Sequence, residues 1–380
     1  MTAPGGRSRA YLDHASTSPA RPEVLAAMAP WLAGGGDPGR AHAEGRAARA
    51  ALEAAREQVA ALVGVRPRAV VLTSGATEAI NAAVWGASRA RPGAPVVCAA
   101  VEHAAVRESS ARAGAVELAV DGHGRVDLGH LDDLLDRRPA PALVNCQWGN
   151  HEVGTRQPVA EVVAACRARG VPVHLDAAAA AGHVPMNLAD LGADLVSLSA
   201  HKLGGPPGAG ALVVRRGLRL EPLLVGGDQE WARRGGMENL AAAVGFGAAC
   251  AAVDVAGEAA AARRRTDAAL AAALAVPGCC AYGDTADRLP HIVCIGVAGV
   301  EAEAVLLGLD QAGVAAHSGS ACASEALEPS PVLAAMGVDA ERSLRVSVGW
   351  SSVDADVAAF AAAFPAVVAR LRALGAPAAP

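Results

Sequence analysis

Lys202 is the only lysine in the chain, and because lysine and arginine together number 33, the remaining 32 of these side chains are arginines. An ammonium group can lose its proton and act as a nucleophile or form a Schiff base, whereas a guanidinium stays protonated. The lysine lies in Ser199-Ala200-His201-Lys202, after the apolar run 194–198, which predicts a strand. The count alone leaves open that Lys202 is a chance survivor of a general drift from lysine toward arginine.

A second motif of small and hydroxyl residues follows another predicted strand. Ser74-Gly75-Ala76-Thr77-Glu78 comes after the apolar run 69–73 and opens a helix that we expect over 77–90. Free backbone N–H groups at a helix N-terminus favour a bound phosphate, and Thr77 adds a hydroxyl. An ordinary helix cap is the alternative interpretation.

Two further polar side chains follow predicted strands. Asp176 comes directly after the run 171–175, at a carboxyl end of the sheet, where open α/β folds bind ligands. Its carboxylate could hold a positive charge such as a pyridinium nitrogen, or cap a helix. His103 follows the run 95–100 and could stack on a flat cofactor or shuttle protons. A purely structural role is the alternative for this histidine.

One of the eight cysteines has an unusual setting. Cys322 ends the small-residue run Ser318-Gly319-Ser320-Ala321-Cys322, between the strand-like piece 314–316 and a helix expected from residue 330. Most other cysteines lie in apolar or alanine-rich runs that are typical of a core, and none has spacing typical of a zinc site. Cys322 therefore has the exposed loop setting of a reactive thiol.

The bulk composition excludes several classes of partner. With a net charge of −5 and a pI near 6.1, the 380 residues imply no basic face for nucleic acid. The N-terminus lacks the apolar core of a signal peptide, and the alanine-rich stretch 241–262 carries Asp254 and Glu258, so we expect no membrane span. A cytoplasmic protein with reduced thiols is the expectation.

Apolar runs alternate with helical stretches along the first two thirds of the chain. The predicted strands are 69–73, 95–100, 116–120, 142–146, 171–175, 194–198 and 211–214, and the helices between them include 77–90, 104–113, 127–136 and 158–169. This rhythm predicts an α/β fold with a largely parallel sheet and helices on both faces. A helical region over 238–275 breaks the rhythm. The remainder, with strands near 291–297 and 343–348, predicts a smaller α+β domain.

In this order, the motifs resemble those of the cysteine desulfurases, pyridoxal-phosphate enzymes of the class V aminotransferase type. The resemblance runs from about Tyr11 to about Ser352. It includes Gly36-x-Pro38, His42-x-x-Gly45-Arg46, Ser74-Gly75-Ala76-Thr77-Glu78, Glu102-His103, Asn150-x-Glu152-Val153-Gly154, Asp176, Ser199-x-His201-Lys202, Gly204-x-Pro206, Arg233-Arg234-x-Gly236-x-Glu238-Asn239, Ser318-Gly319-Ser320-Ala321-Cys322 and Arg345-x-Ser347-x-Gly349.

The resemblance implies aminotransferase fold type I and a homodimer. It implies a large cofactor-binding domain over 14–255, with a mostly parallel seven-stranded sheet flanked by helices. A smaller α+β domain, formed by 1–13 and 256–380, would carry the cysteine loop. The long loop after Cys322 resembles that of the branch that hands sulfur to acceptor proteins.

The resemblance also implies a role for each site residue. Lys202 would hold pyridoxal 5'-phosphate as a Schiff base and move the substrate Cα proton, Asp176 would keep the pyridine nitrogen protonated, and His103 would stack on the ring. Cys322 would attack the sulfur of L-cysteine, giving alanine and a persulfide that passes to a sulfur acceptor. The residues implied for the phosphate are Ala76, Thr77, Ser199 and His201, and those implied for orienting the substrate are Asn150, which would also contact the cofactor, and Arg345.

Three positions depart from the family pattern. Ala179 stands where the family usually has a glutamine that contacts the cofactor ring oxygen, and Met237 where it has a threonine that reaches a neighbouring subunit's phosphate. The family's Gly-Asn-Pro-Ser-Ser is Gly36-Asp37-Pro38-Gly39-Arg40. We expect retained, weaker cofactor binding with an altered near-visible absorption.

Two alternatives stay open: a related lyase or aminotransferase acting on another amino acid, and a weakened homologue serving as a scaffold or regulatory subunit.

Overall fold

The structure, a computed structural model, describes residues 9–318 and 329–375. Its centre is a seven-stranded sheet in the order β2-β8-β7-β6-β5-β3-β4. The strands are β2 (Val70–Thr73), β3 (Val96–Ala99), β4 (Ala115–Leu118), β5 (Leu143–Gln147), β6 (Val173–Asp176), β7 (Leu195–Ser199) and β8 (Gly210–Val214). Each strand coincides with one of the seven predicted runs to within a few residues.

The sheet is mostly parallel, as predicted, with one antiparallel strand. The pairs β3–β4, β3–β5, β5–β6 and β6–β7 are parallel, whereas β8 runs antiparallel to both β2 and β7. The parallel strands therefore bring their carboxyl ends to one edge, where the chain leaves β3, β5, β6 and β7. This edge is the place where open α/β sheets bind ligands.

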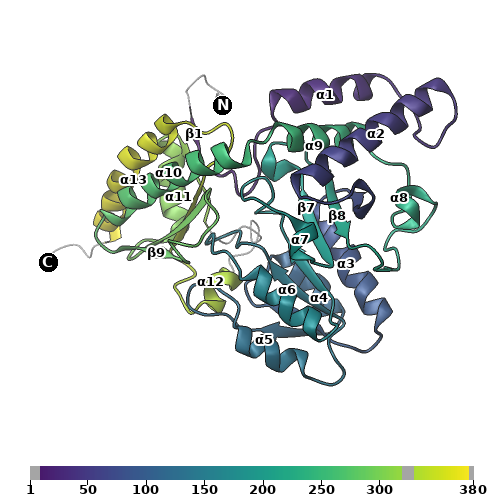
Figure 1. The fold of residues 1–380 in the computed structure, drawn as a ribbon. Helices are drawn as coiled ribbons and strands as arrows, with labels where there is room; N and C mark the ends of the chain where they lie inside the picture. The colour runs from purple at the N-terminus through teal and green to yellow at the C-terminus, as the bar shows by residue number, and fades with distance from the viewer. Residues whose placement is uncertain (1–8, 319–328, 376–380) are drawn as a thin grey trace.

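Helices cover both faces of the sheet (Figure 1). One face packs on α3 (Ala76–Ala90) and α4 (Ala104–Arg112), and the other on α2 (Ala43–Leu62), α5 (Leu128–Leu135), α6 (Val159–Ala168) and α9 (Leu240–Ala252). Alternate residues of a strand belong to opposite faces, as in β8, where Leu212 and Val214 pack on the α3 side and Ala211 and Val213 on the other.

A second core lies in the lobe that Figure 1 shows beside the large sheet. Here β12 (Ser343–Ser347), β10 (Ile292–Val297) and β9 (Cys279–Tyr282) form an antiparallel sheet, and β1 (Ala10–Tyr11) pairs with β11 (Val314–Ala315). The helices are α10 (Val255–Leu274), α11 (Ala302–Gln311), α12 (Pro331–Ala335) and α13 (Asp354–Gly375). The main cluster of this lobe joins Ala10 and Leu12 to residues of 262–368. This supports the division into 14–255 and 1–13 with 256–380, which stays a prediction.

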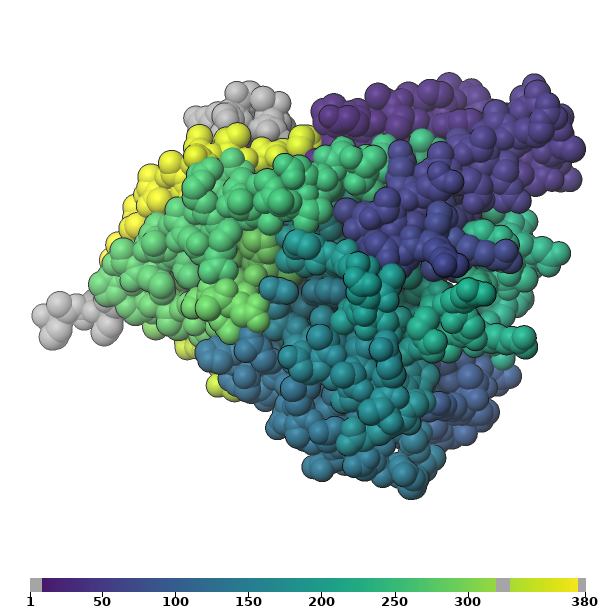
Figure 2. All heavy atoms as spheres, viewed as in Figure 1, coloured from purple at the N-terminus to yellow at the C-terminus, as the bar shows by residue number. Residues whose placement is uncertain are grey.

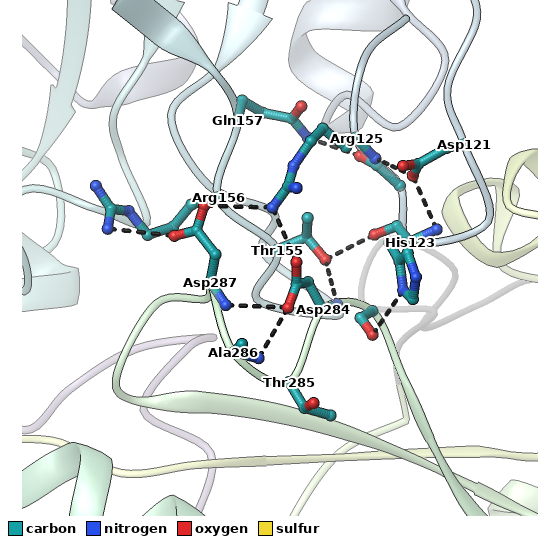
Figure 3. A network of polar contacts seen from close by, with 12 residues as sticks. Asp121, His123, Arg125, Thr155, Arg156, Gln157, Asp284, Thr285, Ala286 and Asp287 are labelled. Atoms are coloured by element: carbon teal, nitrogen blue, oxygen red, sulfur yellow. Dashed lines mark hydrogen bonds and ion pairs between the residues drawn. The ribbon is translucent and has the colours of Figure 1, made fainter.

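Polar side chains join the two lobes on one side of the molecule (Figure 3). Thr155, in the loop after β5, donates from Oγ1 to the His123 carbonyl and accepts the Asp284 N–H at 2.9 Å. Arg125 donates from Nη2 to Asp284 Oδ2 at 2.9 Å and to Asp287 Oδ2 at 3.2 Å. On the face shown in Figure 2 the two lobes are in continuous contact.

Helix α13 is long and apolar enough to cross a membrane by length and composition alone. Its large apolar side chains have another partner in the structure, because Val357, Phe360, Phe364 and Val368 are buried in the core of the smaller lobe. Alanine supplies much of the remaining apolar character. Packing within the lobe therefore accounts for the composition of this helix.

A buried ion pair fixes the segment that leads from the sheet to α9. Glu230 accepts from both terminal nitrogens of Arg56, at 2.6 and 2.8 Å, and its Oε2 also accepts the Leu72 N–H. Neither side chain of the pair is more than 1% exposed. Glu230, Trp231 and Ala232 all have left-handed backbone angles, with φ of 48°, 57° and 60°, which cost non-glycine residues about 1 kcal/mol or more each. The ion pair offsets that cost.

We predict that Glu230→Ala lowers the free energy of unfolding by about 3–5 kcal/mol, because the terminal nitrogens of the buried Arg56 guanidinium lose their carboxylate and only the partly exposed Glu53, at Nε, remains as a counter-ion. Glu221→Ala is the matched control, since Glu221 pairs with Arg89 on the surface and should contribute about 1 kcal/mol or less. Urea unfolding of both variants measures the difference. Equal losses would contradict a special role for the buried pair.

Candidate active site

One cavity of about 430 Å³ opens at the carboxyl edge of the parallel strands. Eight of the ten residues singled out from the sequence line it: Ala76, Thr77, His103, Asp176, Ser199, His201, Lys202 and Arg345. Asn150 does not line it, and Cys322 lies outside the described residues. The sequence motifs therefore come together in space, although their roles stay predictions.

Lys202 is held by its backbone at the end of β7. It belongs to the one-turn 3-10 helix His201–Leu203, and its carbonyl accepts from Ser18 Oγ at 3.2 Å and lies 3.3 Å from His183 Nε2. The next turn requires Gly204, because φ is 85° and a Cβ there would lie 2.7 Å from Arg21 Cγ. The Lys202 side chain thus extends from a turn that several backbone contacts hold in place.

The first turn of α3 borders one end of the cavity and has the backbone geometry that suits an anion. Ala76 and Thr77 belong to that turn, where backbone N–H groups have no intrahelical acceptor. Glu78 supports the turn by accepting the Ser74 N–H at 2.8 Å and pairing with Arg234 at 3.0 Å. Burial would raise the pKa of Glu78, but the bonds from Arg234 and Ser74 lower it overall, so the carboxylate stays ionised.

Asp176 and His103 come from the ends of β6 and β3. Asp176 Oδ1 accepts from Ser197 Oγ at 2.9 Å and from the Ala178 N–H at 3.0 Å, which leaves Oδ2 without a hydrogen bond among the described residues. The His103 Nδ1 accepts the Ala105 N–H at 3.1 Å, so the ring proton lies on Nε2. Burial, with His151 and Lys202 nearby, lowers the pKa of His103 to about 4, and the ring is therefore neutral at pH 7.

Arg345 reaches the cavity from β12 of the smaller lobe. Its guanidinium donates to Asp13 Oδ1 at 2.9 Å, to Ser16 Oγ at 2.7 Å and to the His151 carbonyl at 2.8 Å. The side chain is 1% exposed, and its Nε has no partner among the described residues. The expected carboxylate-binding group is thus in place, with one contact already made to an acidic side chain.

The loop after β5 departs from the sequence expectation. Asn150 is fully buried, and its Oδ1 accepts the N–H groups of Glu152 and Val153, both at 2.8 Å, while Nδ2 donates to the Val101 carbonyl. This side chain shapes the turn, and its neighbour His151 lines the cavity. The sequence signal for His151 was its adjacency to Asn150, which does not tell which of the two faces inward.

Two of the three departures from the family pattern, Ala179 and Met237, lie in different places. Ala179 lines the cavity just after Asp176 and brings no hydrogen-bonding side chain to it. Met237 is 69% exposed and lines a neighbouring hollow together with Ser74 and Gly208, two residues that also border the main cavity.

The chain belongs to the class-V aminotransferase family, whose model matches residues 10–360. It is 40% identical over 381 residues to an IscS-like cysteine desulfurase of Mycobacterium tuberculosis, covering 96% of this chain and 97% of that protein. The fold resembles a NifS-like protein from Rickettsia africae, with a TM-score of 0.86, 27% identity and coverage of 95% and 99% of the two chains. It also resembles SspA in complex with cysteine, with a TM-score of 0.80, 26% identity and coverage of 91% and 100%.

Stability should fall as the solution is acidified, because burial lowers the pKa of seven histidines. In the unfolded chain these imidazoles take up protons below about pH 6.5. In the folded chain they stay neutral down to about pH 4 or lower. Burial raises the pKa of Glu102, and that of Glu152 to about 7, which acts in the opposite direction but involves fewer groups. The histidines are His14, His103, His151, His174, His183, His201 and His291.

We therefore predict a lower urea midpoint at pH 5 than at pH 7.5. Each additional proton bound by the unfolded chain costs about 1.4 kcal/mol per pH unit. Urea titrations followed by circular dichroism at the two pH values measure the shift. A midpoint that is unchanged or higher at pH 5 would rule out neutral, buried imidazoles as the dominant titrating groups.

Proposed function

We propose that this protein is a pyridoxal-phosphate-dependent cysteine desulfurase that converts L-cysteine to L-alanine and leaves a persulfide on Cys322. The observation that carries the proposal is the single cavity in which the only lysine of the chain lies with Asp176, His103 and Arg345. Similarity to enzymes of this activity along nearly the whole chain supports it.

The cavity offers a complementary group for most polar parts of pyridoxal phosphate. The first turn of α3, with Thr77, suits the phosphate, with Ser199 and His201 bordering the same space. The uncommitted Oδ2 of Asp176 suits a protonated pyridine nitrogen, and the Lys202 amine suits the aldehyde. When bound, the cofactor supplies an electron sink for charge that develops at the substrate Cα.

The remaining work is done by side chains of this chain. Arg345 binds the substrate carboxylate through those of its N–H groups that do not already donate to Asp13, Ser16 or the His151 carbonyl. Lys202 moves the proton at the substrate Cα. His103 stacks on the cofactor ring as a neutral imidazole, whose Nδ1 accepts a backbone N–H.

Sulfur transfer requires the Cys322 thiolate. It attacks the substrate sulfur, so that a sulfur–sulfur bond forms and the bond from sulfur to the substrate Cβ breaks. The electron pair of the broken bond stays with the carbon, which takes up a proton to complete alanine. Cysteine and a thiol thus give alanine and a persulfide, with no external oxidant. The persulfide then passes to a sulfur-acceptor protein.

A homodimer and a cytoplasmic location are part of the proposal. Exposed apolar side chains gather on the segment 223–237 beside the α3 end of the cavity, with Val225 80%, Met237 69% and Leu224 41% exposed. Such a patch is typical of a protein interface, and a second copy of this chain is the occupant that we propose. The seven described cysteines are all free thiols, which suits a reducing compartment.

We predict that Cys322→Ala abolishes cysteine-dependent alanine and sulfide release, by at least about 1,000-fold, because no other thiol can replace the nucleophile. Cys280→Ala is the matched control, since Cys280 is exposed on β9 but lies outside the cavity. An alanine assay with L-cysteine as substrate measures both variants. Full turnover by Cys322→Ala would favour a related lyase, and an inactive wild type that binds no cofactor would favour a scaffold.

A further inference from the structure

Arg21 is a buried cation beside the turn that carries Lys202, and no step of the proposed mechanism uses it. Its side chain is 7% exposed and does not line the cavity. Its Nε donates to the Leu203 carbonyl at 3.0 Å, and its backbone N–H donates to the Gly204 carbonyl at 2.8 Å. Arg21 therefore contacts the two residues that follow Lys202.

The sequence explains why this turn needs a donor from elsewhere in the chain. A carbonyl in a helical turn normally accepts from the N–H three or four residues further on. For Leu203 these residues are Pro206 and Pro207, which have no N–H. Leu203 is also 2% exposed, so water does not readily replace the missing donor. The Arg21 side chain thus supplies a hydrogen bond that the turn cannot make locally.

The smaller lobe holds the Arg21 guanidinium in place. Nη2 donates to Oε2 of Glu258, in the first turn of α10, at 2.7 Å. The guanidinium also lies over the ring of Trp350, 5.3 Å from its centroid, and the Trp350 Nε1 donates to the Pro19 carbonyl at 2.8 Å. A guanidinium can bind a carbonyl, a carboxylate and an aromatic face at once. Arg21 therefore joins the Lys202 turn to the smaller lobe.

A stacked pair of histidines makes a second connection of the same kind. The His183 Nε2 lies 3.3 Å from the Lys202 carbonyl. The His183 ring stacks on His291, which directly precedes β10 of the smaller lobe, with centroids 3.6 Å apart and an interplanar angle of 17°. Two separate contacts thus relate the Lys202 backbone to the lobe that also supplies Arg345.

We propose that Arg21 is a positioning residue that fixes Lys202 relative to the smaller lobe, and so relative to Arg345. The inference rests on the proposed function, in which Lys202 moves the proton at the substrate Cα while Arg345 binds the substrate carboxylate. These two side chains come from different lobes. The separation between them therefore depends on how the Lys202 turn is joined to the smaller lobe.

Arg21→Met keeps an unbranched apolar stem but removes every side-chain donor. With saturating cofactor we expect kcat to fall roughly 10-fold or more, because a misplacement of about 1 Å can cost about 100-fold. The KM for L-cysteine should stay within about two-fold, since Arg345 is unchanged. Without substrate, the affinity for pyridoxal phosphate should fall roughly 3- to 10-fold, because Lys202 is less well placed to bind it.

Variants of Glu258 test whether this effect passes through the ion pair. Glu258→Ala should change kcat and cofactor affinity in the same direction but less, and Glu258→Gln, which keeps an acceptor, should lie closer to the wild type. Arg21→Met with Glu258→Ala should be no worse than Arg21→Met alone, because Glu258 acts through Arg21. Steady-state kinetics and absorbance titrations with pyridoxal phosphate give these quantities.

Arg265→Met is the matched control. Arg265 is a partly buried arginine of α10 that pairs with Asp354 at 2.9 Å and does not line the cavity. This variant should leave kcat and cofactor affinity at the wild-type values. Urea midpoints of both arginine variants separate a general loss of stability from a displaced Lys202.

Three results would overturn the inference while leaving the proposed function intact. One is an Arg21→Met protein with a lower urea midpoint but wild-type kcat and cofactor affinity. Another is a double variant whose losses in kcat are the product of the two single losses. The third is an equal loss of kcat in Arg265→Met. A wild type that gives no near-visible band with pyridoxal phosphate would instead overturn the proposed function.

Discussion

The common carboxyl edge of four neighbouring parallel strands is the constraint on which the site depends. The chain leaves β3, β5, β6 and β7 at this edge, and these four exits supply His103, His151, Asp176 and Lys202. Hydrogen bonding between the strands fixes their spacing, so residues separated by about 100 positions in sequence share one cavity. The smaller lobe completes the site by inserting Arg345 from β12.

Burial determines the charges at this edge. His103, His151 and His201 surround the Lys202 turn, and burial, with Lys202 nearby, lowers the pKa of each. A single amine is thus placed among imidazoles that stay neutral at pH 7. Neutral rings can donate hydrogen bonds and pack on an aromatic cofactor without competing for its anionic phosphate. Because the imidazoles stay neutral, positive charge around the cavity is restricted to Lys202, Arg345 and the helix N-terminus.

Much of the fold could be predicted from the sequence, because the strands of a covered sheet are continuous apolar runs. All seven runs became strands, but apolar runs carry no information on neighbours, so the antiparallel direction of β8 was not foreseen. The composition of 238–275 predicts one helical region, whereas the structure divides it into α9 and α10, because Asp254 caps a new helix by accepting the Gly257 N–H. Helix α1 (Pro22–Ala33) and strand β9 were also missed.

The site was likewise predictable where it depends on residue types and their order, and not where it depends on contacts in three dimensions. Residue types and order identified eight residues that line the cavity, since each follows a strand or lies in a recognisable motif. That His151 rather than Asn150 lines the cavity could not be foreseen. It depends on which backbone N–H groups donate to the Asn150 side-chain oxygen. The contact of Arg345 with Asp13 depends likewise on the pairing of distant strands.

The most direct measurement is to map the covalent attachment of the cofactor. The purified protein would be incubated with pyridoxal phosphate, reduced with borohydride, digested and analysed by mass spectrometry, with Lys202→Arg treated in parallel. We expect one pyridoxyl group, on the peptide that contains Lys202, and none on any side chain of the variant. A wild type without this adduct, or with an adduct only at its N-terminus, would contradict the assignment of Lys202 as the cofactor-binding amine.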